Sequence, residues 1–248
     1  MNDLIMKKIT LLSLISAISY GAVAHAGAMG ESGSCCSAFV ALEGGYTRSM
    51  IDNYDYSLIG LGSITSTKNN DGYTARLAAG MISMVDDQVG FTGELGWGYY
   101  GRTTLDSTNT GLLAALPSTL SIQHTLSGFD VLLGVAYVQQ YFSLSLKAGA
   151  LVQNMQTKTD ANIIDLAFPI YDSFTEKKNQ TAVLPEIKLG AAYNFDDNWA
   201  ITGAYMYALG GTPRSVGTFN PDTGRANLVV NSQNPSTNTL LLGIQYTV

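Results

Sequence analysis

Residues 183–207 alternate between two faces with a period of two residues. The first half of this stretch places apolar side chains on one face and small or charged ones, including Glu186 and Lys188, on the other. Asp196 and Asp197 mark a turn, and a second alternating run follows it. Side chains of a β-strand point alternately to opposite faces, so the stretch predicts a hairpin. Strands of about ten residues are long enough to cross a bilayer when they are tilted.

The rest of the mature chain repeats this pattern. The expected strands cover residues 39–47, 72–81, 89–102, 122–137, 141–154, 183–193, 199–207 and 238–248. Long loops (49–71, 103–121, 155–180 and 210–237) alternate with short turns (83–88, 138–140 and 194–198). Outer-membrane barrels have short periplasmic turns and long extracellular loops. The chain therefore predicts an all-β fold, an eight-stranded antiparallel up-and-down transmembrane β-barrel. A soluble β-sandwich with one solvated face would share the alternation and is the alternative.

The N-terminus has the features of an export signal. Lys7 and Lys8 precede an apolar run at residues 9–20, and the small-x-small sequence Ala24-His25-Ala26 follows it. This pattern is typical of a secretory signal peptide. The run is too short for a transmembrane helix, and no later run reaches the roughly 18 apolar residues that such a helix needs. We expect residues 1–26 to be a signal peptide, 27–37 a periplasmic lead-in and 38–248 the barrel.

Charge and cysteine content limit the functions of the chain. The net charge of −6 argues against binding of nucleic acid, which requires a basic surface. The two cysteines, Cys35 and Cys36, are adjacent, and a disulfide between neighbours would be strained. We interpret them as incidental thiols or as thiols that form mixed disulfides. Lipid attachment would need a leucine-like residue three positions earlier, where the chain has Ser32.

Two stretches resemble a known family. The last strand, TLLLGIQYTV, carries Tyr246 third from the end and resembles the C-terminal signature of outer-membrane barrels, although it ends in Val248 where that signature prefers Phe. The stretch PEIKLGAAYNFDDNWAITGAYMY resembles the sixth and seventh strands of the OmpA/OmpX-type and opacity-protein-like small barrels. The resemblance implies the bacterial outer membrane as location. It also implies contact with outer-membrane lipid and lipopolysaccharide, and insertion by the barrel-assembly machinery.

Charged residues fall on the inner faces of the expected strands. They are Glu43, Arg76, Glu94, Asp130, Lys147, Glu186 and Lys188. The interior of an eight-stranded barrel is just wide enough for side chains, and unpaired charges there are costly. We expect these residues to pair as a polar plug, Glu43 with Arg76 and the others in a wider network. The alternative is that they line a narrow conduit.

Aromatic residues fall on the outer faces, near the strand ends. They are Tyr46, Tyr73, Trp97, Tyr99, Tyr137, Phe142, Tyr193, Trp199, Tyr205, Tyr207 and Tyr246. Such residues form girdles where strands leave the hydrocarbon. A soluble core could also use them.

Little in the sequence supports catalysis. His124 is the only histidine after signal removal, and Ser121, Ser127 and Asp106 lie near it in the sequence. We interpret His124 as a solvated rim residue. No metal-ligand spacing and no phosphate-binding loop is present. We therefore expect no catalytic residue, no metal and no cofactor.

The expected extracellular loops contain apolar segments at residues 58–61, 112–116 and 163–171. The last supplies a candidate interaction surface, made of Ile163, Ile164, Leu166, Phe168, Ile170 and Tyr171. Exposed apolar segments either pack on each other as a lid or bind a host surface, a lipopolysaccharide or a small apolar ligand. We expect a monomeric, non-enzymatic barrel that contributes to envelope integrity and surface interaction. A conduit for small or apolar molecules and a lipid-modifying enzyme are the alternatives.

Overall fold

The computed structural model describes residues 36–51, 55–58, 62–109, 119–164, 171–212, 214–220, 225–231 and 233–248. The expected signal peptide and nearly all of the lead-in lie outside these ranges. The strands are β1 (Cys36–Ser49), β2 (Asp55–Leu58), β3 (Gly62–Asn69), β4 (Asp71–Met84), β5 (Val89–Asn109), β6 (Thr119–Val138), β7 (Phe142–Ile164), β8 (Tyr171–Asn194), β9 (Trp199–Ala208), β10 (Arg214–Asn220), β11 (Arg225–Asn231) and β12 (Thr237–Thr247).

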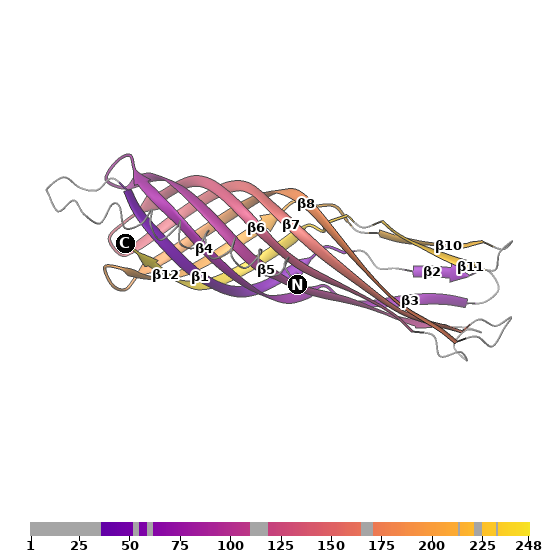
Figure 1. The fold of residues 1–248 in the computed structure, drawn as a ribbon. Coiled ribbons are helices and arrows are strands. Elements are labelled where there is room, and N and C mark those ends of the chain that lie inside the picture. Colours follow the sequence, from indigo (N-terminus) through magenta and orange to yellow (C-terminus); the bar gives the residue numbers. More distant parts are fainter. Residues whose placement is uncertain are drawn as a thin grey trace, which may run out of the picture.

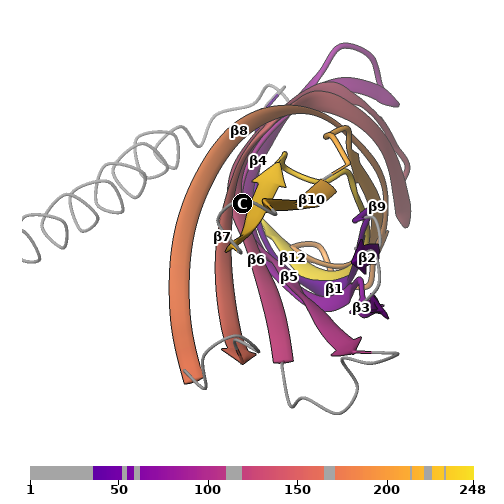
Figure 2. The ribbon, with the colours of Figure 1, turned by 90° about the vertical axis from the view of Figure 1, so that its right-hand side faces the viewer.

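Eight of these strands close into a ring (Figures 1 and 2). The order is β4-β1-β12-β9-β8-β7-β6-β5, every neighbouring pair is antiparallel, and β5 pairs with both β4 and β6 to complete the circle. Closure leaves no free edge within the ring, as a span through lipid requires. The predicted eight-stranded barrel is confirmed.

The register of the pairs determines how strongly the strands tilt. If the paired residues are followed once around the ring from Tyr46, the path returns to β1 at Cys36, ten residues from where it began. The intervening partners are Leu240, Tyr205, Leu189, Leu146, Val135, Phe91 and Ser83. A stagger of this size in a barrel of eight strands corresponds to a tilt of about 40–45°.

Two expected loops are wrong in extent, because the strands continue far into them. β5 runs to Asn109 and β6 begins at Thr119, so most of residues 103–121 is strand. Likewise, β7 continues to Ile164 and β8 begins at Tyr171. These segments are rich in Thr and other polar residues, so they lack the apolar face that marks a membrane strand, yet Thr favours β-structure. They extend the barrel wall at the end opposite the short turns, which is the extracellular end in outer-membrane barrels, and are visible beyond the ring in Figure 2.

The other two expected loops also contain strands. β2 and β3 pair with each other within residues 49–71, and β3 adds to the extension of β5. β10 and β11 form a separate hairpin within residues 210–237. Figure 1 shows both hairpins at the end of the molecule opposite the short turns.

A bulge in β5 changes which side chains face inward. The β5–β6 register shifts between Tyr99 and Arg102, and Gly101 lies there with a φ of 96°. That conformation suits glycine, which has no Cβ to clash. After the bulge the odd-numbered Thr103 and Leu105 are buried, whereas before it the even-numbered positions faced inward.

Candidate functional site

The lumen of the barrel collects the seven charged residues that the sequence placed on inner faces. Glu43, Arg76, Glu94, Asp130, Lys147, Glu186 and Lys188 are all buried. Alternation along the strands turns them inward. Small residues leave room for them: a Cβ at Gly96 would collide with the guanidinium of Arg76.

Arg76 lies at the centre of this network. Its Nε donates to Asp130 Oδ2 at 2.9 Å and its Nη2 to Asp130 Oδ1 at 2.5 Å, a bidentate pair. Its Nη1 donates to Glu43 Oε2 at 2.5 Å, and Nη2 lies 2.7 Å from Glu94 Oε1. The Tyr100 hydroxyl also donates to Asp130, at 3.0 Å. One guanidinium therefore links strands β1, β4, β5 and β6 across the lumen, which suits its fixed fork of donors.

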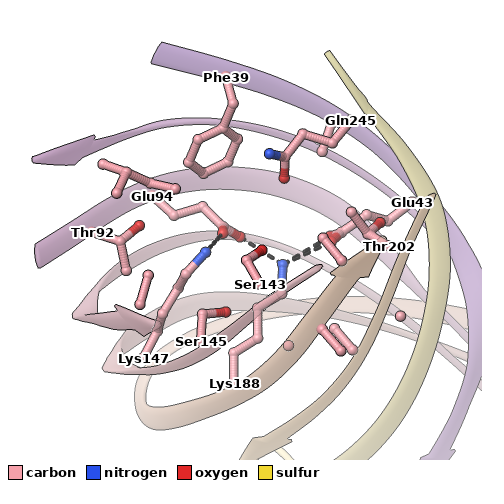
Figure 3. Close-up of a pocket in the computed structure, with 18 residues that line it drawn as sticks. Phe39, Glu43, Thr92, Glu94, Ser143, Ser145, Lys147, Lys188, Thr202 and Gln245 are labelled. Atoms are coloured by element: carbon pink, nitrogen blue, oxygen red, sulfur yellow. Dashed lines mark hydrogen bonds and ion pairs between the residues drawn. The ribbon is translucent and has the colours of Figure 1, made fainter. Parts of the chain in front are cut away.

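Two lysines complete the network from the other side of the ring. Lys188 Nζ donates to Glu43 Oε1 at 2.8 Å and to Glu94 Oε1 at 2.7 Å. Lys147 donates to the second oxygen of Glu94. Figure 3 shows these four side chains pointing toward one another. Every base of the network thus contacts a carboxylate, as burial of charge requires.

Glu186 is the exception among the seven. It is 2% exposed, its Oε2 has no hydrogen-bond partner, and it takes part in no ion pair among the described residues. We expected it to join the wider network. Four acids face three bases, so one carboxylate remains without a base.

An apolar layer fills the lumen on the extracellular side of the network. Its buried members are Tyr100, Leu126, Leu151, Met155, Leu184, Ala204, Met206, Ala208 and Leu241. They come from β5, β6, β7, β8, β9 and β12, so the layer reaches around most of the ring. Close-packed side chains of this kind exclude water and ions. We call this group the apolar layer.

Polar residues lie beyond the apolar layer. His124 is fully buried, and its Nδ1 lies 2.9 Å from Thr157 Oγ1 while Nε2 has no partner. Asn234 donates to the backbone oxygen of Gln153 at 2.9 Å. The expectation that His124 is a solvated rim residue is wrong, because β6 and β7 continue beyond it and enclose its imidazole group.

The two serines and the aspartate that lie near His124 in the sequence do not contact it. On β6, Ser121 and Ser127 have the opposite parity to His124, so their side chains face away from the lumen. Ser121 Oγ donates instead to Asp106 Oδ1 at 2.8 Å. A nucleophile needs its base within hydrogen-bond reach. Ser121, Ser127 and Asp106 therefore form no such pair with His124, whose hydroxyl partner is the buried Thr157.

A small cavity lies on the periplasmic side of the charged network. Its volume is about 40 Å³, and its lining includes Phe39, Thr92, Ser143, Lys147 and Lys188 (Figure 3). A cavity of roughly 10–15 Å³ already holds one water molecule. The cavity therefore has room for only a few waters, next to the ammonium groups of the network.

The outer surface of the ring carries an apolar belt between two groups of aromatic residues. Tyr46 packs edge-on against Tyr73 with ring centroids 6.2 Å apart, at the extracellular end of the belt. Trp199 packs against Tyr246 at 4.9 Å, beside the short turns. Of the expected girdle, Trp97, Tyr99 and Tyr205 are also exposed, while Tyr137 and Tyr207 are partly exposed.

The candidate loop surface can be located only in part. Ile163 and Ile164 lie at the end of β7, and Ile164 pairs with Tyr171 at the start of β8. Leu166, Phe168 and Ile170 lie outside the described residues.

Sequence reasoning gave no role to several residues of the lumen. Tyr100 is an even number of residues from Glu94 on the same strand, and this inward position was the only feature of the sequence that pointed to it. Asn234 had none, because it lies in a stretch expected to be a loop. At the start of β1, Cys36 is an exposed free thiol, 3.5 Å from Ser83 Oγ. Cys35 lies outside the described residues.

The described ranges offer no cluster of metal ligands. Within them, no group of three or more His, Cys, Asp or Glu side chains could hold a metal ion. In the same part of the chain, no helix is long and apolar enough to cross a membrane.

The sequence profile of the outer membrane protein beta-barrel domain matches residues 16–247. The chain belongs to this family of outer-membrane barrels. A comparison with curated proteins gives no match.

Solved structures of outer-membrane barrels are similar to this one at low identity. Ail, the attachment invasion locus protein of Yersinia pestis, is 13% identical, with 85% of this chain and 98% of that chain covered and a TM-score of 0.41. A major outer membrane protein from Thermus thermophilus is 15% identical, with 85% and 99% covered and a TM-score of 0.43. The outer membrane protease OmpT from Escherichia coli is 8% identical, with 90% and 99% covered and a TM-score of 0.42.

Proposed function

We propose that this outer-membrane barrel is a non-enzymatic protein that contributes to envelope integrity and to interaction at the cell surface. The observation that carries the proposal is the distribution of structure along the barrel axis. Below the outer rim the lumen is filled with paired charges and an apolar layer, and beyond the rim the wall continues as long strands. β7, for example, extends 12 residues past Val152, an exposed apolar residue of the belt on its outer face.

In this proposal each part of the barrel has its own task. The apolar belt and its aromatic rims hold the protein in outer-membrane lipid, next to lipopolysaccharide. The ion pairs and the apolar layer keep the lumen shut, so that the protein adds no leak to the membrane. The extensions of β5, β6, β7 and β8 raise the interaction surface above the lipid headgroups. The protein acts as a monomer that the barrel-assembly machinery inserts.

Deletion of residues 163–171 tests the interaction part. The expected surface residues at the tip of the β7–β8 hairpin would be replaced by a short Gly-Ser turn, and adhesion of expressing bacteria to cultured host cells would be counted. We expect adhesion to fall. A shift in gel mobility on boiling, together with envelope fractionation, would show that the variant still forms a barrel in the outer membrane. Unchanged adhesion by a correctly inserted variant would contradict the proposal.

A second candidate function, a conduit for small molecules, is favoured by the cavity beside Lys147 and Lys188. A water-filled space within the lumen is the first half of a path across the membrane. The apolar layer blocks the second half. We therefore place this function after the first, and conductance separates the two.

A further inference from the structure

β8 is much longer than its neighbour β9, which leaves part of its edge uncovered. β8 pairs with β7 without interruption from Tyr193 to Tyr171. Its pairing with β9 covers only Glu186 to Asn194. One more bond follows, from the Leu209 N–H to the Pro185 oxygen at 2.9 Å. Beyond Pro185, β8 has a described neighbour on one side only, which Figure 2 shows at the outer margin of the wall.

The bond at Pro185 identifies the backbone groups that face this open edge. In a strand, the N–H and C=O of one residue point to the same side, and the side alternates from residue to residue. Pro185 accepts from the β9 side, so Val183, Thr181, Asn179 and Lys177 point their backbone groups to that side as well. Proline is tolerated at position 185 for the same reason, since its missing N–H would not have bonded to β7.

The open edge carries lysines, which help to protect an edge strand from non-specific pairing, but it lacks two other common protections. Residues 171–184 contain no proline, and the β7–β8 register shows no bulge. Exposed edges of this length are templates for pairing with another strand. Proteins that bind peptides by strand addition use such an edge, with main-chain bonds for affinity and side chains for specificity.

Charge favours one kind of strand over others. Lys177 is exposed on the outer face of the edge, and Lys178 is exposed on the inner face. Lys158 of β7 lies directly opposite Lys177. Its ammonium is 2.7 Å from Asp160, whose pKa it lowers by donating a hydrogen bond in this extracellular extension. The charge of Lys177 also lowers the pKa of Asp160, so this one acid faces two lysines, and Lys177 forms no ion pair of its own among the described side chains.

We propose that the open edge of β8, residues 175–183, binds an extended acidic segment of a partner protein by strand addition. Glutamates or aspartates on such a strand would lie beside Lys177 on one face and Lys178 on the other, and opposite charges on adjacent strands attract. A second copy of this chain would bring the same two lysines, so its charges are less favourable. The inference rests on the proposed surface-interaction function and names the partner class for it.

The test uses the full chain in detergent micelles and a fluorescent synthetic peptide. The peptide has twelve residues, in which glutamate alternates with valine and threonine, and fluorescence anisotropy reports its binding. Asn179→Pro removes an N–H that faces the open edge but none that bonds to β7, and Asn179→Ala is the matched control. We expect the proline variant to bind at least about tenfold more weakly and the alanine variant to bind like the wild type. Lys177→Glu with Lys178→Glu should weaken binding to a similar degree.

Several outcomes overturn the proposal. If Asn179→Pro binds the peptide as well as Asn179→Ala, main-chain pairing is absent. If only the lysine substitutions matter, the surface is an ionic one that a sulfated glycan would also fit. Equal binding of a peptide with lysines in place of the glutamates removes the charge argument. Size measurement of the protein alone shows whether copies occupy the edge.

Two controls keep the outcomes separate. A mobility shift on boiling checks that each variant is folded. Should Asn179→Pro not fold, peptides N-methylated at alternate residues test the wild-type edge instead, because one of the two alternating sets removes the pairing N–H groups. If the wild-type edge binds no peptide while expressing bacteria still adhere normally to host cells, this inference is wrong and the proposed function stands. The adhesion of bacteria that carry the deletion of residues 163–171 tests the proposed function and not this inference.

Discussion

Arg76 compensates three buried carboxylates at once, which makes it the most sensitive single residue of the lumen. Arg76→Leu would leave Asp130, Glu43 and Glu94 with fewer or no basic partners in a low-dielectric interior. Breaking a buried ion pair by removing one partner costs about 3–5 kcal/mol. We expect a loss of that size in the free energy of unfolding, measured by urea titration in lipid vesicles. Arg102→Leu, on the exposed outer face, should change it little, and equal effects would show that the network is not specific.

Glu186 and Glu94 provide a contrast between an unpaired and a paired acid. Glu94 contacts Arg76, Lys147 and Lys188, whereas Glu186 forms no ion pair among the described residues. Glu94→Gln should lower the free energy of unfolding by a few kcal/mol, because bases lose their partner. Glu186→Gln should leave it unchanged or raise it, since a buried carboxyl group without a basic partner is replaced by a neutral group of nearly the same shape. The same vesicle titration measures both, and equal losses would mean that Glu186 is compensated by a group outside the described network.

Which charged side chains face the lumen could be predicted from the alternation along each strand, but most of their ion-pair partners could not. Glu43 and Arg76 are cross-strand neighbours on the first two crossings of the barrel, and the adjacency of consecutive strands was enough to suggest them. The contact of Arg76 with Asp130 crosses to β6, and that of Lys188 with Glu94 joins β8 to β5. Both depend on the stagger of ten residues around the ring, which no local pattern reveals. His124 was misjudged for a related reason, because its burial depends on how far the neighbouring strands continue.

At the scale of the strand, β1 is packed more closely against its neighbouring strands at Gly45 than at Gly44, so a larger side chain is tolerated less well at Gly45. A Cβ on Gly45 would collide with the backbone oxygen of Leu240 and lie 3.0 Å from Leu241 Cα. On the adjacent Gly44, a Cβ would lie 3.9 Å from the oxygen of Thr74, an ordinary contact. Gly45→Ala should therefore force β1 and β12 apart and cost about 1–3 kcal/mol. Gly44→Ala should be nearly neutral.

The β1–β12 seam is where this effect should be seen, because it joins the two ends of the chain. Urea unfolding in vesicles gives the stability of both glycine variants. The rate at which the unfolded protein inserts into vesicles gives a second readout, since the seam closes only when the last strand has paired. If Gly44→Ala and Gly45→Ala behave alike, the seam is more adaptable than its packing indicates.

Strand existence was predictable at this scale, while strand length was not. Apolar alternation marks the part of each strand that crosses the belt, so all eight crossings were found. The extensions of β7 and β8 are mostly polar and contain several threonines and lysines, a composition that strands and loops share. Only their mutual pairing, from Met155–Gln180 to Ile164–Tyr171, makes them strands. The open edge of β8 follows from this length difference and could therefore not be predicted from the sequence.

For the whole molecule, the lumen contains two barriers in series. Lys147, Lys188 and their carboxylates form the first, and the apolar layer around Leu151 and Met206 forms the second. An ion must pass both, so opening one leaves the other in place. We expect no steady conductance step in planar bilayers from the wild type. Neither Glu94→Ala with Lys147→Ala nor Leu151→Ala with Met206→Ala should conduct, because each pair of substitutions opens a single barrier.

Only the variant that carries all four substitutions should give reproducible steps, since it alone connects the periplasmic cavity to the outer rim. Preparations that shift in gel mobility on boiling are counted, which excludes unfolded protein. If the charge variant alone conducts, the ion pairs are the sole barrier and the apolar layer is permeable. If the wild type conducts steadily, the barrel is an open conduit and the proposed closed anchor is wrong. Because the two barriers differ in chemistry, the pattern across the four proteins identifies the barrier that controls passage.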